Sequence, residues 1–277
     1  MQAQLKLKEI DKQTCFVKGT HRAKGRTRQL SPENSASRNL YYGRVKIDAG
    51  DAPIEFSTED HETGFICLNG SATVATGESS FQLNRYDALY VPRDSQVTVS
   101  TKNGCDLAEI SSPVENQYPV QFVSFEENRN DPALHFIAGA PPTERDLNVL
   151  LGKNIEAGRI MAGVTFSTEG NWTSWPPHQH HDMLEEAYLY IDMPDPGWGI
   201  QMVYTDRNEP ELVQVVHEGD VVVMPKGYHP NVAAPGGSIN FLWMMAANRE
   251  GIDRQFGVVN VQPEYAQAGS GLEASQK

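Results

Sequence analysis

Short apolar runs, some alternating with polar residues and some continuous, dominate the chain, and turn residues separate them. The runs are rich in Val, Ile, Tyr, Phe and Thr and end at Gly, Pro, Asn or Asp, which is typical of β-strands. The pattern predicts strands over residues 64–77, 86–101, 160–168, 186–193, 199–206, 219–230 and 239–246. A helical pattern is seen only over 144–151 and near the C-terminus. Many short strands with frequent turns predict an all-β sandwich or barrel.

The strand pattern also repeats along the chain. Residues 87–92 (DALYVP) have the same frame as residues 220–225 (DVVVMP), and upstream of them 65–68 (FICL) resembles 188–191 (YLYI). Such self-similarity indicates two copies of one β unit, joined through the proline-rich stretch 112–142. We therefore predict an N-terminal arm (1–30), a first barrel (31–125), a second barrel (126–266) and a disordered tail (267–277).

The histidines are concentrated in the second copy. Five of the eight lie between residues 178 and 229. Three of these five lie in two motifs, a His178-x-His180 pair followed by Glu185-Glu186 and a segment, PKGYH, that ends at His229. Residues i and i+2 of a strand share a face, so the first two imidazoles can reach one ion. First-row divalent metals bind neutral imidazole and carboxylate, and catalytic sites keep coordination positions open. The pattern predicts a metal centre, with His181 and His217 as bystanders.

The first copy lacks this ligand set. When the copies are aligned on their prolines, Gln96 falls opposite His229. No His-x-His precedes the first-copy strand, which has only His61 and Glu62 nearby. We therefore expect one metal per chain, in the second barrel.

Composition excludes several other classes of function. The chain is 39% hydrophobic and 21% charged, and its net charge of -13 argues against a nucleic-acid partner. The basic run over residues 18–28 is interpreted as a solvated arm or a subunit contact. No apolar run is long enough to span a membrane and no secretory signal is evident. Cys15, Cys67 and Cys105 are odd in number and scattered, which favours a reducing cytoplasm.

Two spaced motifs carry a resemblance to a known superfamily. The order Gly…His-x-His-x4-Glu…Gly-x5-Pro-x-Gly-x-His over residues 170–229 resembles the signature motifs of the cupins, in which three histidines and one glutamate bind a metal. Within that superfamily, residues 170–180, 184–188, 203–206 and 219–230 resemble 5-deoxy-glucuronate isomerases of myo-inositol breakdown. The whole chain also resembles the related uronate ketol-isomerases of pectin breakdown. The fold this implies is two tandem cupin barrels, which are double-stranded β-helices of jelly-roll type.

The resemblance implies a metal-dependent isomerase that interconverts aldose and ketose forms of a deoxy-uronate. The first substrate it suggests is 5-deoxy-glucuronate, converted to 5-dehydro-2-deoxy-gluconate. The short loop between His180 and Glu185 is closer in length to that of the 5-keto-4-deoxyuronate ketol-isomerases, which remain the alternative. The alternatives of another class are a cupin dioxygenase and a bicupin that binds sugar acids without turnover. A small sugar-acid substrate and a homo-oligomer, a dimer or larger, are implied as partners.

The resemblance also assigns roles to residues. It implies His178, His180, Glu186 and His229 as ligands of one divalent metal, with zinc first and manganese, iron, cobalt or nickel as alternatives. Spacing from His180 favours Glu185 as the carboxylate ligand, but the strand frame Glu-x-Tyr-x-Tyr favours Glu186, which we choose because strand register is hard to shift.

The remaining roles are a proton carrier and a cation for the substrate carboxylate. A metal-bound hydroxide, Glu185 or Tyr188 could move the proton. Lys226, in the metal-ligand loop, is our first choice of cation, and Arg145 and Arg249 are further candidates for binding the substrate.

Overall fold

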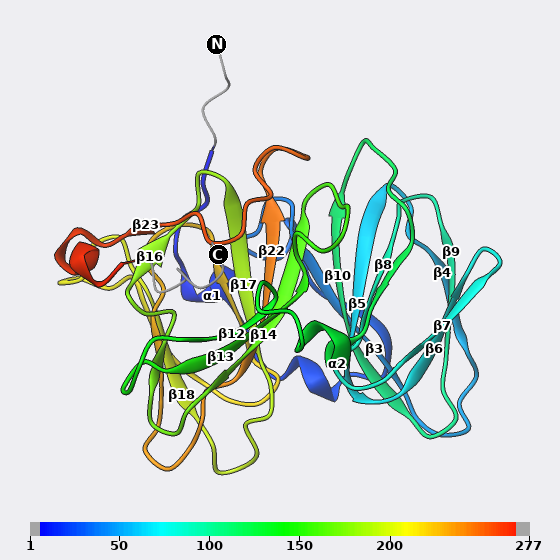
Figure 1. Cartoon of the computed structure of the whole chain (residues 1–277), viewed down its shortest axis with the longest axis horizontal. Helices are drawn as coiled ribbons and strands as arrows, with labels where there is room; N and C mark the ends of the chain where they lie inside the picture. Colours follow the sequence, from blue (N-terminus) through cyan, green and yellow to red (C-terminus); the bar gives the residue numbers. More distant parts are fainter. Residues whose placement is uncertain (1–5, 270–277) are drawn as a thin grey trace.

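The structure, a computed structural model, describes residues 6–269 and consists almost entirely of β-strands that form two barrels side by side (Figure 1). The all-β prediction is confirmed, but the helix suggested over 144–151 was wrong, because those residues pair as a strand. No described helix is long and apolar enough to cross a bilayer. The helical elements are short: α1 (Lys12–Cys15), η1 (Thr20–Arg22), α2 (Phe125–Asn128) and η2 (Pro263–Ala268).

The first barrel consists of a six-stranded and a four-stranded antiparallel sheet. In spatial order, the larger sheet contains β11 (Gln121–Val123), β8 (Ala88–Val91), β5 (His61–Gly70), β10 (Cys105–Pro113), β3 (Tyr41–Ile47) and β2 (Gly25–Leu30). The smaller sheet contains β4 (Ile54–Ser57), β9 (Gln96–Ser100), β6 (Ala72–Thr76) and β7 (Ser79–Leu83).

The second barrel repeats this plan with a seven-stranded sheet, a four-stranded sheet and a two-stranded ribbon. In spatial order, the large sheet contains β1 (Phe16–Val17), β20 (Val221–Met224), β17 (Leu184–Tyr190), β22 (Phe241–Ala247), β14 (Ile160–Ser167), β13 (Arg145–Leu151) and β12 (His135–Ala138). The smaller sheet contains β15 (Trp172–Thr173), β21 (Asn231–Ala233), β18 (Gly199–Val203) and β19 (Leu212–Val216), and the ribbon pairs β16 (His178–Gln179) with β23 (Asn260–Val261).

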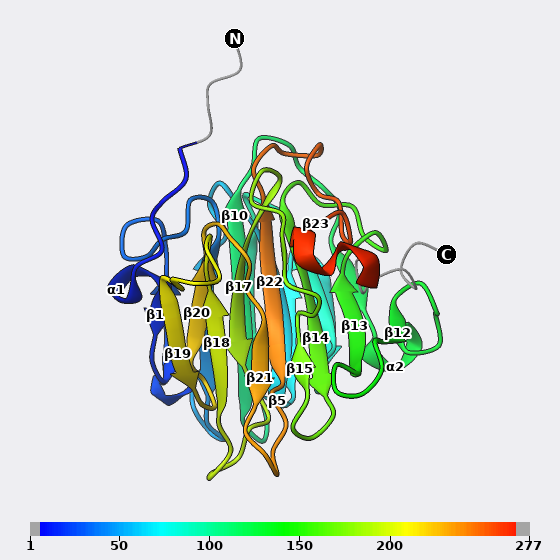
Figure 2. The same cartoon turned by 90° about the vertical axis from the view of Figure 1, so that its left-hand side faces the viewer.

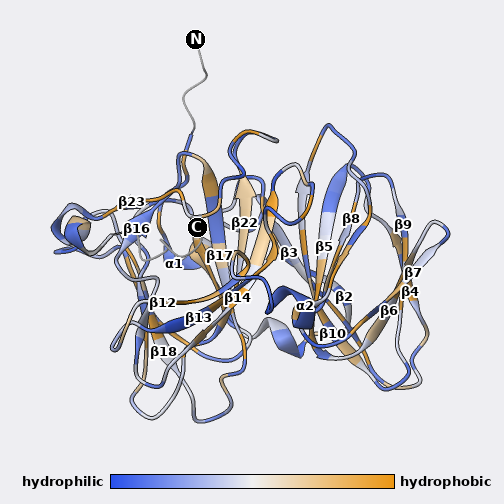
Figure 3. Ribbon diagram, in the orientation of Figure 1, coloured by the Kyte–Doolittle hydropathy of each residue, from blue (hydrophilic) through white to orange (hydrophobic). Residues whose placement is uncertain are grey.

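The large sheets of the two barrels face each other, and this explains why their strands are apolar on both faces. On β5, Phe65 packs inside the first barrel, whereas the next residue, Ile66, belongs to the core between the barrels. Ile110, Ile160 and Leu189 lie in that same central core. Strand β6, on the outer sheet, instead alternates buried and half-buried residues, as expected for a strand with one solvated face. Figure 3 shows the apolar colouring on β22, where the barrels meet.

Strand register confirms that the two barrels are equivalent position by position. Gly43 on β3 pairs with Glu109, and Gly163 on β14 pairs with Trp243 in the matching place. A Cβ on Gly163 would lie 2.2 Å from the Trp243 ring and one on Gly43 would lie 2.5 Å from the backbone oxygen of Thr27, so both positions need glycine. The neighbouring strands β2 and β13 carry a register shift at the same point, after Arg28 and after Val149.

Each copy sends its first strand to the barrel of the other copy. Phe16 on β1 pairs with Val222 of the second barrel, and Phe122 on β11 pairs with Leu89 of the first. Figure 2 shows β1 beside β20. The same Phe-Val dipeptide forms both exchanged strands. Residues 16–17 and 25–30 of the predicted arm add strands to two different sheets, so this part of the chain is not a solvated arm.

Two aspartates at equivalent positions of the repeat anchor the exchanged segments. Asp220 Oδ1 accepts a hydrogen bond from the Gly19 backbone N–H at 2.8 Å, and Asp87 Oδ1 accepts one from Phe125 at 2.9 Å. These are the first residues of the two repeated motifs, 87–92 and 220–225, so the repeat visible in the sequence marks the anchoring points. The boundary predicted after residue 125 stays a prediction and falls within α2. Residues 267–268 of the predicted tail belong to η2, and residues 270–277 lie outside the described residues.

Two buried glutamates hold the barrels together in the same reciprocal way. Glu62 on β5 accepts backbone N–H bonds from Gly158, Arg159 and Ile160 at 2.5–2.7 Å, just before β14. Glu185 on β17 accepts backbone N–H bonds from residues 38, 39 and 40, just before β3. Each carboxylate therefore crosses from one barrel to the other. We call this pair of contacts the carboxylate clasp.

Candidate metal centre

Four side chains of the second barrel converge in its interior. His178 lies on β16, His180 follows that strand, Glu186 lies on β17, and His229 lies in the loop between β20 and β21. The ligand-type nitrogens of the three histidines all lie within 4.8 Å of one another. Glu186 Oε2 lies 3.1 Å from Nε2 of both His180 and His229. All four residues are at least 92% buried, so the cluster lies well away from bulk water.

The backbone fixes the orientation of each imidazole. Nδ1 of His178 lies 2.8 Å from the carbonyl oxygen of Pro176, Nδ1 of His180 lies 3.1 Å from that of Leu184, and Nδ1 of His229 lies 3.2 Å from that of Gly227. A carbonyl can only accept, so in each ring Nδ1 carries a proton. Nε2 faces the cluster and is a lone-pair donor to a metal when the ring is neutral, or a hydrogen-bond donor to Glu186 when it is protonated. Metal-binding histidines are commonly oriented by such outer contacts.

The contact between His229 and Glu186 tests whether a cation fits this cluster. Nε2 of His229 is buried and has no aligned hydrogen-bond partner, although the Glu186 oxygen lies 3.1 Å away. With Nδ1 protonated, the two facing atoms are both acceptors, and burying them unpaired costs free energy. A divalent cation between them would satisfy both. The donor set therefore fits a first-row metal.

The charge states follow from burial and from these contacts. Burial and the neighbouring imidazoles lower the pKa of His178 to about 3, so this ring is neutral at pH 7. Burial alone would raise the pKa of Glu186, but the facing imidazoles of His180 and His229 outweigh it and lower the value to about 2. Burial likewise opposes protonation of His180, but the Glu186 carboxylate outweighs it and raises the pKa. A neutral imidazole beside an ionised carboxylate is the state that a metal binds.

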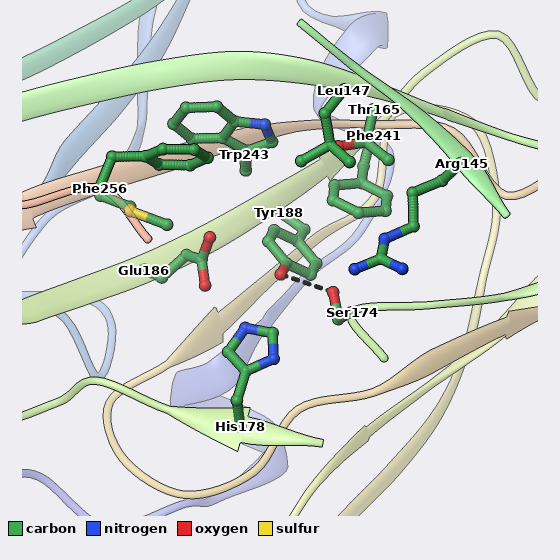
Figure 4. Close-up of a pocket in the computed structure, with 11 residues that line it drawn as sticks. Arg145, Leu147, Thr165, Ser174, His178, Glu186, Tyr188, Phe241, Trp243 and Phe256 are labelled. Carbon is green, nitrogen blue, oxygen red and sulfur yellow. Dashed lines mark hydrogen bonds between the residues drawn. The ribbon is translucent and has the colours of Figure 1, made fainter. Parts of the chain in front are cut away.

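A small cavity of about 40 Å³ opens beside the cluster, and a cation lies at its far side (Figure 4). Arg145 on β13 is 97% buried and lines this cavity together with His178, Glu186 and Tyr188. The Tyr188 hydroxyl lies 2.7 Å from the hydroxyl of Ser174. Burial raises the pKa of Tyr188 well above its usual value, so the phenol stays protonated at neutral pH.

Three of the predicted site residues lie outside this cavity. Glu185 points to the opposite face of β17 because neighbouring residues of a strand alternate, and its carboxylate forms part of the clasp. Lys226 turns outward and pairs with Glu9 at 2.8 Å, because Gly227 (φ 86°) reverses the chain between it and His229. The guanidinium of Arg249 pairs with the buried Asp253 at 2.5 Å. The structure thus does not bring these three together with the cluster.

Sequence reasoning missed most of the cavity wall. Ser174 carries no spacing signal, although its positive φ of 50° aims it at Tyr188. Trp243 comes from a strand that was predicted only as a strand, and Phe256 comes from a loop. The wall residues outside the predicted set are Leu147, Thr165, Ser174, Phe241, Trp243, Met245 and Phe256.

The fold and the cluster together define a two-barrel cupin with one candidate metal centre. An IolB-like protein from Salmonella typhimurium LT2 has the same fold, with a TM-score of 0.80 and 24% identity over 92% of this chain and 98% of its own. A variant of oxalate decarboxylase from Bacillus subtilis gives a TM-score of 0.62 at 13% identity, over 94% of this chain and 84% of its own. The chain belongs to the KduI/IolB family, whose sequence profile matches residues 15–262.

Two relatives found by sequence comparison carry the same name. A 5-deoxy-glucuronate isomerase from Geobacillus thermodenitrificans is 28% identical over 250 residues, which is 83% of this chain and 89% of the relative. One from Geobacillus kaustophilus is 29% identical over 219 residues, or 73% of this chain and 78% of the relative. The prediction of this family and of a cupin fold is confirmed.

Proposed function

We propose that this protein is a metal-dependent isomerase that interconverts the aldose and ketose forms of a deoxy-uronate. The observation that carries the proposal is one buried cavity that joins the three-histidine, one-glutamate cluster to the guanidinium of Arg145. The names of the relatives support 5-deoxy-glucuronate as the substrate and 5-dehydro-2-deoxy-gluconate as the product.

The reaction moves one hydrogen between adjacent carbons while negative charge develops on an oxygen. A divalent metal held by His178, His180, Glu186 and His229 would supply Lewis acidity to the carbonyl and the neighbouring hydroxyl. We assign Arg145 to the substrate carboxylate, to which a guanidinium can donate charge-assisted hydrogen bonds. The distance between the cluster and this cation would then decide which end of the substrate reacts.

Tyr188 is the residue that we assign to proton movement. Its hydroxyl is protonated, lines the cavity and is oriented by Ser174, so it can donate a hydrogen bond or a proton to the oxygen on which charge develops. Glu185 and Lys226 are not assigned a catalytic role, because neither lines the cavity. Arg249 is not assigned to the substrate for the same reason.

The size of the cavity implies that binding requires movement. About 40 Å³ accommodates an ion and about one or two water molecules, but not a six-carbon acid. Phe256 comes from an irregular segment rather than from a paired strand. We propose that this segment moves outward when the substrate enters.

An anaerobic assay with two substrates tests the proposal. The purified protein is loaded with zinc, manganese, iron, cobalt or nickel and mixed with 5-deoxy-glucuronate or with 5-keto-4-deoxyuronate. We expect conversion of the first without oxygen, with zinc, our proposed metal, identified by elemental analysis of the purified protein. Tyr188→Phe should lower turnover by about 100-fold or more while the metal content stays unchanged.

The other outcomes separate the remaining candidates. Conversion of 5-keto-4-deoxyuronate alone would identify a uronate ketol-isomerase, which the short loop after His180 favours. Activity that requires oxygen would indicate a dioxygenase, and binding without conversion of either acid would leave a sugar-acid-binding bicupin.

We also propose a homo-oligomer in the cytoplasm. Strand β19 lies at the edge of its sheet and exposes Val213 and Val215, which supports association through that edge. The three cysteines are buried and unpaired, which supports a reducing compartment. Light scattering on the purified protein would measure the oligomeric state, and a monomer would contradict the first part of this proposal.

A further inference from the structure

The first barrel has a cavity in the place where the second barrel has its metal centre. Strand register makes Thr63 equivalent to Glu186 and Ser111 equivalent to Met245, and all four residues line the respective cavities. The cavity of the first barrel measures about 340 Å³, against about 40 Å³ in the second. A volume of this size matches that of small-molecule sites. The first barrel, which lacks the metal ligands, therefore has a larger space here rather than a filled core.

The wall of this cavity is polar where the equivalent wall of the second barrel is apolar. Arg26 and Glu109 replace Leu147 and Trp243, and the two form a bidentate ion pair at 2.7 and 2.8 Å. The Arg26 guanidinium also lies 3.7 Å above the ring of Phe56. Because Glu109 neutralises the charge of Arg26, this pair shapes the cavity wall but leaves no unpaired charge on it.

Arg28 supplies the free positive charge. Its guanidinium lies 4.9 Å from the centre of the Tyr41 ring, and it forms no ion pair with any residue among 6–269. Stacking on an aromatic face leaves the in-plane N–H groups of a guanidinium available to a carboxylate. Tyr41 also contacts His61 edge-on at 4.6 Å, so the ring holds both side chains at the cavity wall.

The other polar groups of the cavity wall can form hydrogen bonds with the hydroxyl groups of a ligand. Nδ1 of His61 lies 2.8 Å from the Asp60 carboxylate, so Nε2 is the acceptor, and Nε2 is buried without a hydrogen-bond partner. Burial lowers the pKa of His61, which keeps the ring neutral. Thr63 and Ser111 are each only 2% exposed and add hydroxyl groups to the lining. The exposed Glu59 and Asp60 also line the cavity, and Arg28 is the cation that a carboxylate can reach there. With these hydroxyl-binding groups, the lining fits a ligand that has one anionic group and several hydroxyl groups.

We propose that the cavity of the first barrel is a second, metal-free binding site for a small hydroxylated carboxylate such as an aldonate or a uronate. Arg28 binds the carboxylate, and His61, Thr63 and Ser111 bind the hydroxyls. The site does not depend on the reaction proposed for the second barrel, because it shares no residue with that cavity.

Protein-detected NMR on the full-length, isotope-labelled protein tests this site. D-gluconate is the probe, and amide signals of Arg28 and Thr63 report on the first barrel while those of Ser174 and Tyr188 report on the second. Two matched probes separate the contribution of the carboxylate to binding from that of the hydroxyl groups. Sorbitol has the hydroxyl groups without the carboxylate, and hexanoate has the carboxylate without the hydroxyl groups. Each should bind the first barrel about tenfold or more weakly than gluconate, because each lacks one set of hydrogen bonds.

Variants then assign the site to its residues. Arg28→Gln should weaken gluconate binding at the first barrel by more than about tenfold, and Arg28→Lys, which keeps the charge without the planar fork, by less. Lys102→Gln removes an exposed cation of the same barrel and should change nothing. Arg145→Gln should affect only the signals of the second barrel. Absence of first-barrel shifts with gluconate, or an unchanged titration in both folded Arg28 variants, would overturn the proposal.

Discussion

The two barrels place different side chains on the same backbone frame. Thr63 stands where Glu186 stands, and Gln96 stands where His229 stands in the repeat alignment. The structural contacts are instead shared, since Glu62 matches Glu185 and Asp87 matches Asp220. The comparison shows that the groups which join the barrels were kept in both copies, whereas the groups which provide a metal site are present in one. Structure and chemistry can therefore be perturbed separately.

The largest expected effect comes from removing one predicted metal ligand. His229→Ala should abolish stoichiometric metal and lower turnover by more than about 1,000-fold, because a Lewis acid contributes several kcal/mol to such a reaction. The matched variant Gln96→Ala changes the equivalent residue of the first barrel and should leave both unchanged. Elemental analysis and an isomerase assay on both variants provide the measurement. Full metal content in the His229 variant would refute the proposed ligand set.

The carboxylate clasp gives the next largest effect, and here both barrels should respond alike. Glu62→Gln and Glu185→Gln each replace a buried carboxylate that accepts three backbone N–H bonds, so each should reduce the free energy of unfolding by about 2–3 kcal/mol. Chemical denaturation with circular dichroism would measure the loss.

The two clasp variants should differ in metal binding. Glu185 is the neighbour of Glu186 on β17, so loosening it should also weaken metal affinity, whereas Glu62→Gln should not. Equal metal affinity in the two folded variants would show that the clasp stabilises the barrels without positioning the ligand strand. Tyr188→Phe, which leaves the clasp intact, is the control for changes made on that strand.

The sequence was sufficient to locate the cluster because the spacing of its members is fixed by strand geometry. His178, His180, Glu186 and His229 lie at turns and strand ends whose lengths the motifs encode, and the structure brings them together. The choice of Glu186 over Glu185 depended on the strand frame Glu-x-Tyr-x-Tyr of the resembling families, because the spacing from His180 favoured Glu185. The all-β fold was likewise readable from the period of the apolar runs.

What the sequence could not show depends on contacts between distant segments. Phe256 and Ser174 reach the cavity through loops, where spacing gives no periodic signal. The exchange of β1 and β11 is invisible because a two- or three-residue strand is too short to show a pattern, and the basic run that looked like a solvated arm begins next to β1. Lys226 looked favourable as a cation because it lies close to His229 in sequence. A turn between the two residues points the Lys226 side chain outward, away from the cluster that His229 joins.

Arg145 gives the smallest expected effect, and its equivalent in the first barrel provides a matched control that can be replaced without affecting the proposed active site. Strand register matches Arg145 with Lys24, an exposed residue that pairs with Asp48 on the surface. Arg145→Gln should lower kcat/KM by about 10–100-fold, mainly through KM, because a charge-assisted hydrogen bond to the substrate carboxylate contributes about 1.5–3 kcal/mol. Lys24→Gln should leave the kinetics unchanged. A fall in kcat with KM unchanged would instead place Arg145 at the reacting end of the substrate, and the orientation proposed for the substrate in the cavity would have to be reversed.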